Sequence, residues 1–241
     1  MAAFVWETKV MRIRCVVFAL LFVLAMNVPR IQAALRSIGT ATYGAGAYQL
    51  IYDDLQQLVW LDYTNPSPGN DWQKQVDWAE SLNAPGVLSY NINPGETVDW
   101  GTSQWRLPIV DESVARWDGE CFGYAGPRPD GTYDYFWGYN MTNSEMGHLY
   151  CVSLGNLGFL GTNGLTWPDW DFSDKNTMPF ERIEIGMTYT TGTGYSPDTT
   201  QYAWSFQFGF GILEKRDKTL ACGAMAVRPA TVETVALPLP G

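Results

Sequence analysis

The stretch Tyr-Ala-Trp-Ser-Phe-Gln-Phe-Gly-Phe-Gly, residues 202–211, decides the fold class of this chain. Every even-numbered position from 202 to 210 is aromatic, and every odd-numbered position is small or polar. Successive side chains of a β-strand point to opposite faces, so five rings at this spacing share one face, whereas a helix would scatter them. The pattern predicts a half-buried core strand, with an exposed aromatic platform for a ligand as the alternative.

Neighbouring segments in the second half of the chain extend this strand into a sheet. We expect Ile183–Thr191, the aromatic strand and Leu220–Val227 to form an antiparallel meander, with Glu214–Lys218 as a charged turn. Short connections join antiparallel neighbours, and the connections here are short.

Two further strands are predicted in the first half of the chain. They are Tyr48–Tyr52 and Leu58–Leu61, and the turn-prone pair Asp53 and Asp54 separates them. Both segments are rich in the apolar and aromatic residues that strands favour.

Two helices are predicted from their apolar spacing and their capping residues. Trp72–Leu82 places its apolar residues on one side, and either Asn70 or Asp71 can cap its first turn. Thr142–Leu154 is the second helix, in which Thr142 and Glu145 have the spacing of a capping box.

Composition is typical of an extracellular, loop-rich domain that contains β-structure. The chain has 241 residues, enough for one sizeable core, and includes 11 Trp, 13 Tyr and 11 Phe. Only 17% of its residues are charged, while 24 Gly and 14 Pro supply many turns. The formal net charge is −10 and there is no basic stripe, so nucleic acid is not an expected partner.

The first 34 residues are predicted to be a signal peptide, with Met1 and Met11 as alternative starts. Arg12 and Arg14 give it a positive end, Cys15–Val28 is an apolar run, and small residues before position 35 suit cleavage. The run is shorter than the roughly 20 residues that span a bilayer, so cleavage is expected in preference to anchoring. We therefore expect a secreted or cell-surface protein without a stable membrane span.

Three cysteines remain after cleavage, and an oxidising compartment predicts one disulfide among them. The favoured pair is Cys121 with Cys151, because they are close in sequence, and the rival pair is Cys151 with Cys222. None of them has the Cys/His spacing of a zinc site.

A loop with alternating carboxylates and indoles is the first candidate for a ligand site. Carboxylate oxygens suit Ca²⁺ and indole rings stack on sugar faces, whereas the plain structural alternative is a solvated turn whose Trp residues plug the core. Ca²⁺ is therefore a candidate ligand, and no cofactor is required. With one further aspartate, which follows Ser-Pro, the candidate ligand-binding residues are Trp167, Asp169, Trp170, Asp171, Asp174 and Asp198.

No catalytic residue is predicted. His148 and Glu145 could share a proton or a metal, but structural or capping roles explain both residues equally well. Ser144 lacks the Gly-x-Ser-x-Gly frame of a hydrolase nucleophile. Arg106 and Arg228 are expected as buried partners of Asp or Glu, with an anion clamp as the alternative.

Several motifs occur in an order that resembles the Lcl C-terminal domain family of exported bacterial proteins, over residues 46–229. The motifs are Trp78-Ala79, Trp105–Pro108, Ser144–Leu149, Tyr202–Trp204 and Ala226–Pro229. The Pro-rich tail, residues 230–241, is similar to the start of a PEP-CTERM sorting tail.

The resemblance implies an α+β, C-type-lectin-like fold, with two helices around a twisted antiparallel sheet and long loops. It also implies an exported, non-enzymatic binding or adhesion domain that recognises a glycan or a cell-surface or matrix component. Relatives include adhesins that bind glycosaminoglycans, although the acidic composition here argues against a sulfated glycan. The alternatives are an enzyme of the formylglycine-generating fold, for which Cys222 is the late cysteine, and a structural component of an extracellular matrix.

Overall fold

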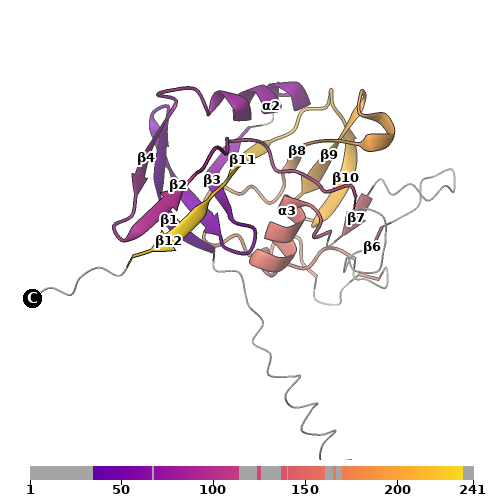
Figure 1. Cartoon of the computed structure of the whole chain (residues 1–241). Helices are drawn as coiled ribbons and strands as arrows, with labels where there is room; N and C mark the ends of the chain where they lie inside the picture. Colours follow the sequence, from indigo (N-terminus) through magenta and orange to yellow (C-terminus); the bar gives the residue numbers. More distant parts are fainter. Residues whose placement is uncertain are drawn as a thin grey trace, which may run out of the picture. The chain divides into compact units, whose positions relative to one another are not determined.

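The computed structural model describes residues 35–66, 68–113, 124–125, 137–139, 141–160, 165–166 and 170–235. This part of the chain is mostly antiparallel sheet with two short α-helices, an α+β arrangement (Figure 1). The predicted signal peptide lies outside it, as does Cys121, and the last described residue of the predicted tail is Val235. No helix in these ranges is long and apolar enough to cross a membrane.

The first sheet separates two hydrophobic clusters. Its strands, in spatial order, are β11 (Ala224–Pro229), β3 (Leu58–Asn65), β2 (Gly46–Asp53), β1 (Leu35–Tyr43) and β4 (Leu88–Ile92). In β3, Trp60 belongs to one cluster, while Val59 and Leu61 belong to the other. Alternate side chains of a strand point to opposite faces, so this sheet is buried on both sides.

The two strands predicted in the first half of the chain are confirmed as β2 and β3, with the turn after Asp53 between them. The sequence pattern did not predict β1, which pairs with both β2 and β4. Its middle is Ser-Ile-Gly-Thr-Ala-Thr, a run without alternating apolar residues. Sheet position rather than side-chain pattern makes this segment a strand.

The second sheet contains the aromatic strand. Its order is β6 (Tyr124–Ala125), β7 (Trp137–Tyr139), β10 (Ile212–Asp217), β9 (Tyr202–Gln207) and β8 (Thr188–Gly194). Three of the five rings lie in β9, while Phe208 and Phe210 belong to the turn that follows. Trp204, Phe206 and Phe208 are buried in the core, so the core-strand prediction is confirmed and the exposed platform is wrong.

The predicted meander is only partly correct. β8, β9 and β10 are antiparallel neighbours, but the segment expected as a charged turn is mostly strand β10. The segment expected as the third strand of the meander forms β11, which lies outside this sheet and pairs with β3 of the first. The backbone of Gly223 joins the two sheets at this point, because its N–H donates to the Thr188 carbonyl (3.0 Å) and its carbonyl accepts from Thr190 N (2.9 Å).

A two-stranded ribbon of β5 (Glu96–Asp99) and β12 (Thr231–Thr234) completes the described strands. The first predicted helix is confirmed as α2 (Trp72–Ser81), and Asp71 caps it by accepting a hydrogen bond from Lys74 N at 3.0 Å.

The second predicted helix exists, but its expected start is wrong. α3 spans Glu145–His148 and continues as a π-helical turn, Leu149–Ser153. Ser144 caps α3 by accepting from Gly147 N, so Thr142 and Glu145 do not form the capping box. The Glu145 carboxylate is instead directed to Arg106.

Candidate functional site

The predicted ligand loop is described in part. Trp167 and Asp169 lie outside the described residues. The half-buried Trp170 stacks on Phe210 (ring centroids 5.5 Å apart) and contacts Phe159 edge-on (4.9 Å), while the Lys175 ammonium lies 4.6 Å from its ring. Trp170 thus has its rings packed against the protein, as the core-plug alternative predicted.

Two aspartates of the candidate site, Asp171 and Asp198, close their own turns, while Asp174 is an exposed residue of the same loop as Asp171. Asp171 accepts hydrogen bonds from the amide and hydroxyl of Ser173, both at 2.8 Å, and these bonds lower the pKa of Asp171. Asp198 bonds in the same way to Thr200 and to Gln201 N, and its pKa is also lowered. Among the residues that the structure describes, no group of three or more His, Cys, Asp or Glu side chains could hold a metal ion.

The described cysteines do not support the rival disulfide. No bond joins Cys151 to Cys222, and the Cys222 thiol is buried against Thr190, with its pKa raised by burial. The favoured pair lies beyond what the structure describes, since it includes Cys121.

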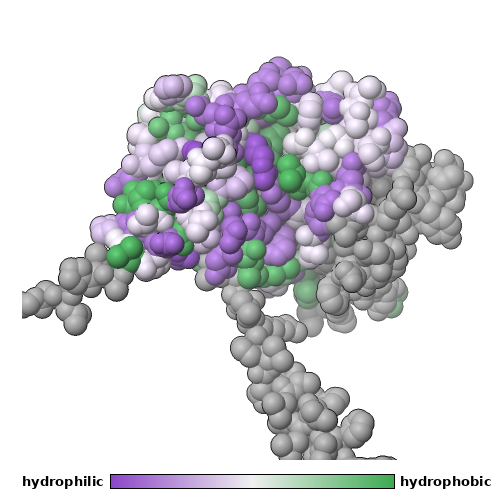
Figure 2. Space-filling view, viewed as in Figure 1, coloured by the Kyte–Doolittle hydropathy of each residue, from purple (hydrophilic) through white to green (hydrophobic). Residues whose placement is uncertain are grey.

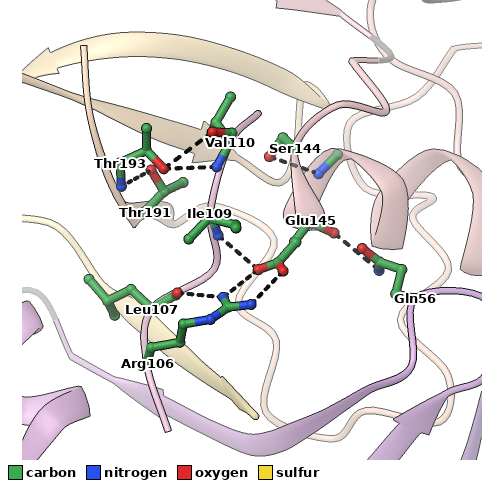
Figure 3. A network of polar contacts seen from close by, with 10 residues as sticks. Gln56, Arg106, Leu107, Ile109, Val110, Ser144, Glu145, Thr191 and Thr193 are labelled. Atoms are coloured by element: carbon green, nitrogen blue, oxygen red, sulfur yellow. Dashed lines mark hydrogen bonds and ion pairs between the residues drawn. The ribbon is translucent and has the colours of Figure 1, made fainter. Parts of the chain in front are cut away.

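A different site is built around the ion pair of Arg106 and Glu145 (Figure 3). Both guanidinium Nη atoms donate to the carboxylate at 2.7 Å, and Ile109 N donates to it at 2.8 Å. The Arg106 backbone is itself fixed by a bridge to Val227 of β11. The prediction that Arg106 partners an acid is confirmed.

Further hydrogen bonds hold this pair in place. The Gln56 amide donates to the Glu145 backbone carbonyl (3.3 Å) and to the buried Asp53 carboxylate (2.9 Å). On the other side, Val110 N donates to the Thr193 hydroxyl at 2.9 Å (Figure 3). Four separate segments of the chain therefore meet here, and their polar groups are paired with one another.

An open groove of about 600 Å³, which we call the larger groove, lies over the ion pair. Four segments that are distant in sequence line it: residues 56–58, residues 99–103 with Arg106, Glu145 of α3, and residues 229–231. The exposed side chains of Gln57, Asp99, Thr102 and Thr231 offer it amide, carboxylate and hydroxyl groups. Sequence reasoning missed this site because no single motif contains it.

Trp100 forms an aromatic wall beside these polar groups. Its ring lies 5.5 Å from Tyr90 and 5.9 Å from Trp105, and the Arg228 guanidinium stacks 4.5 Å from its centre. In the described part of the chain Arg228 forms no ion pair, so the expectation that it partners an acid is wrong. Its aromatic partner takes the place of a carboxylate.

The described residues on the face seen in Figure 2 are a mixture of hydrophilic and hydrophobic, and the hydrophobic ones form small separate groups. Large contiguous apolar patches are typical of stable protein interfaces. A polar groove is therefore a stronger candidate than an apolar docking face on this side of the molecule.

No protein-family model, curated protein or solved structure matches this chain.

Proposed function

We propose that this chain is an exported, non-enzymatic binding or adhesion domain, and that the larger groove binds a saccharide. The observation that carries the proposal is the pairing of amide, hydroxyl and carboxylate side chains with an aromatic wall, Trp100, over a floor in which Arg106 and Glu145 neutralise each other. Sugars present both hydroxyl groups and apolar C–H faces, and this lining can meet both.

The dimensions of the groove fit a saccharide. Its volume of about 600 Å³ falls within the range of roughly 300–1,000 Å³ that small-molecule sites occupy. Its floor is fixed by the bidentate Arg106–Glu145 pair, so a ligand would meet preorganised groups. We propose a glycan of a cell surface or matrix as the natural source of the saccharide.

The surroundings of the Ser153 hydroxyl and the His148 imidazole also favour a binding role over catalysis. Ser153 Oγ lies 3.5 Å from His148 Nδ1, but it is buried and donates to Asp53 at 2.5 Å. Burial lowers the pKa of His148, although the nearby Asp53 charge opposes that effect. A serine that is buried and bonded to a carboxylate has no access to a substrate. We therefore assign Ser153, His148 and Asp53 a structural role in the core.

We further propose that the fold is a C-type-lectin-like variant, as the family resemblance implies. Two of the motifs behind that resemblance, Trp105–Pro108 and Ser144–Leu149, are the segments that the Arg106–Glu145 ion pair joins. A third, Ala226–Pro229, supplies β11 beside them. These three motifs therefore meet at the Arg106–Glu145 ion pair, whose side chains line the larger groove.

The proposal is tested by screening the purified exported protein on a glycan array and measuring the affinity of each hit by titration calorimetry. Thr231→Val removes one groove hydroxyl and keeps the β-branched shape, so it should weaken a hit about fivefold. Thr97→Val is the matched control, because Thr97 is an exposed strand residue of the same ribbon that does not line the groove. The proposal would be overturned if the protein bound no glycan on the array, or if Thr231→Val and Thr97→Val had equal affinities for a hit.

A further inference from the structure

A second groove of about 420 Å³, which we call the smaller groove, adjoins the larger one. It is lined by the turn after α2 (residues 82–86), by Tyr90 of β4, by residues 101–105 and by Arg228. Gly101, Thr102 and Ser103 line both grooves. A ligand longer than one sugar unit can therefore lie in both grooves at once.

Among the residues that the structure describes, Arg228 is the only charged one that lines the smaller groove. Its guanidinium stacks on Trp100 and donates from Nε to the Ser103 hydroxyl at 3.3 Å. Within the described ranges no carboxylate lies at ion-pair distance from it, in contrast to Arg106, whose charge is neutralised by Glu145. The smaller groove thus presents an uncompensated, oriented positive charge in a chain of net charge −10.

The remaining polar groups of this groove include hydrogen-bond donors. Tyr90 is 39% exposed, and its hydroxyl accepts from Trp105 Nε1 at 2.8 Å, which leaves its own proton available to a ligand. The side chains of Thr102 and Gln104 are exposed and add a hydroxyl and an amide. Donors and one cation together suit an anionic oxygen group.

We infer that the smaller groove binds a carboxylate of the saccharide ligand through Arg228, while the adjoining sugar unit lies in the larger groove. This inference rests on the proposed function and names its substrate class, an oligosaccharide that carries an acidic sugar. The planar guanidinium matches a carboxylate with two parallel hydrogen bonds, and stacking on Trp100 fixes its orientation in advance. The acidic chain repels densely charged polyanions, which favours an isolated carboxylate over a heavily sulfated chain.

The experiment compares acidic saccharides with their own methyl esters, which differ only in the charged group. Trigalacturonic acid and sialyllactose, two different acidic skeletons, are titrated into the full chain at low salt. At least one acid should bind roughly tenfold more tightly than its ester, and added salt should reduce the difference. Arg228→Gln should abolish the preference, whereas Arg228→Lys should keep part of it.

Two variants keep the test decisive even where Arg228→Gln disturbs folding. Gln104→Glu places a carboxylate in the smaller groove at an exposed side chain, so it should remove the acid preference without lowering the melting temperature. Arg182→Gln makes the same charge change as Arg228→Gln at an exposed position that lines neither groove, so it should leave the preference intact.

The outcomes separate the two proposals. Equal binding of each acid and its ester would overturn the carboxylate site and leave the saccharide function standing. An acid preference that survives Gln104→Glu would place the charge recognition elsewhere and so overturn the inference. Absence of binding to every acidic and neutral saccharide would overturn both.

Discussion

Replacing Glu145 with glutamine removes the charge that holds α3 against the segment 106–109. The carboxylate accepts three hydrogen bonds, two from the Arg106 guanidinium at 2.7 Å and one from Ile109 N at 2.8 Å. The amide of Glu145→Gln has one oxygen left to accept, and its NH₂ group faces other donors. Arg106 is then left with a charge that no carboxylate balances.

The loss of stability expected for Glu145→Gln depends on how exposed the Arg106–Glu145 ion pair is to water. Breaking a fully buried ion pair costs about 3–5 kcal/mol, and an exposed pair contributes about 0–1 kcal/mol. The Arg106 side chain is 31% exposed and that of Glu145 17%, which places this pair between the two limits. We expect Glu145→Gln to lower the free energy of unfolding by about 2 kcal/mol. For a domain of this size that corresponds to a fall of about 4–8 °C in melting temperature.

Urea unfolding, monitored by tryptophan fluorescence, measures this change in the free energy of unfolding. Glu233→Gln is the control, because Glu233 is exposed on β12. A double-mutant cycle with Arg106→Gln should give a coupling free energy of about 1–2 kcal/mol, since the two side chains contact each other directly. A cost below about 0.5 kcal/mol for Glu145→Gln, or additive single effects, would refute the idea that this pair fixes the floor of the larger groove.

Three other expectations follow from buried groups. The pKa of His148 is lowered in the fold, so as the pH falls below about 6.5 the unfolded chain binds a proton at this residue before the folded chain does. The free energy of unfolding should therefore fall as the pH falls from 7.5 to 5.5. His148→Gln should make the urea midpoint less dependent on pH over this range. The buried Cys222 thiol, with its raised pKa, should react with iodoacetamide at least about tenfold more slowly in native protein than in urea, and equal rates would contradict its burial. Trp170→Ala should cost about 2 kcal/mol by loss of packing on Phe210, independently of Ca²⁺; a melting temperature that rises with Ca²⁺ only while Trp170 is present would contradict the packing role.

Local elements could be predicted from the sequence because their signals are local. α2 has an Asp cap and a one-sided apolar face, and β9 has alternating rings. Both signals depend only on residues within one turn or a few strand positions. β1 lacks such a signal and becomes a strand because β2 and β4 flank it.

The candidate site could be predicted only in its parts. The sequence predicts an acidic partner for Arg106 and a capping role for Glu145, but their pairing depends on the path of the chain between them. The sequence also predicts an acidic partner for Arg228, whereas the tertiary structure places Trp100 beside it. The larger groove is formed by four segments that are distant in sequence, so the spacing of residues along the chain does not predict it.

The crossing of β11 from one sheet to the other has a consequence for folding kinetics. The first four residues of β3, Leu58–Leu61, are apolar, and without β11 the backbone edge of this strand would be open to another chain, the usual starting point of aggregation. Pairing between such distant segments raises contact order, which slows folding. Gly223 bonds to β8 directly before β11 begins, so the completion of the first sheet and the contact between the two sheets depend on the same segment of chain. The edge of β3 is therefore open until residues 224–229 are available, and a truncation before residue 224 should give an aggregating product rather than a smaller stable domain.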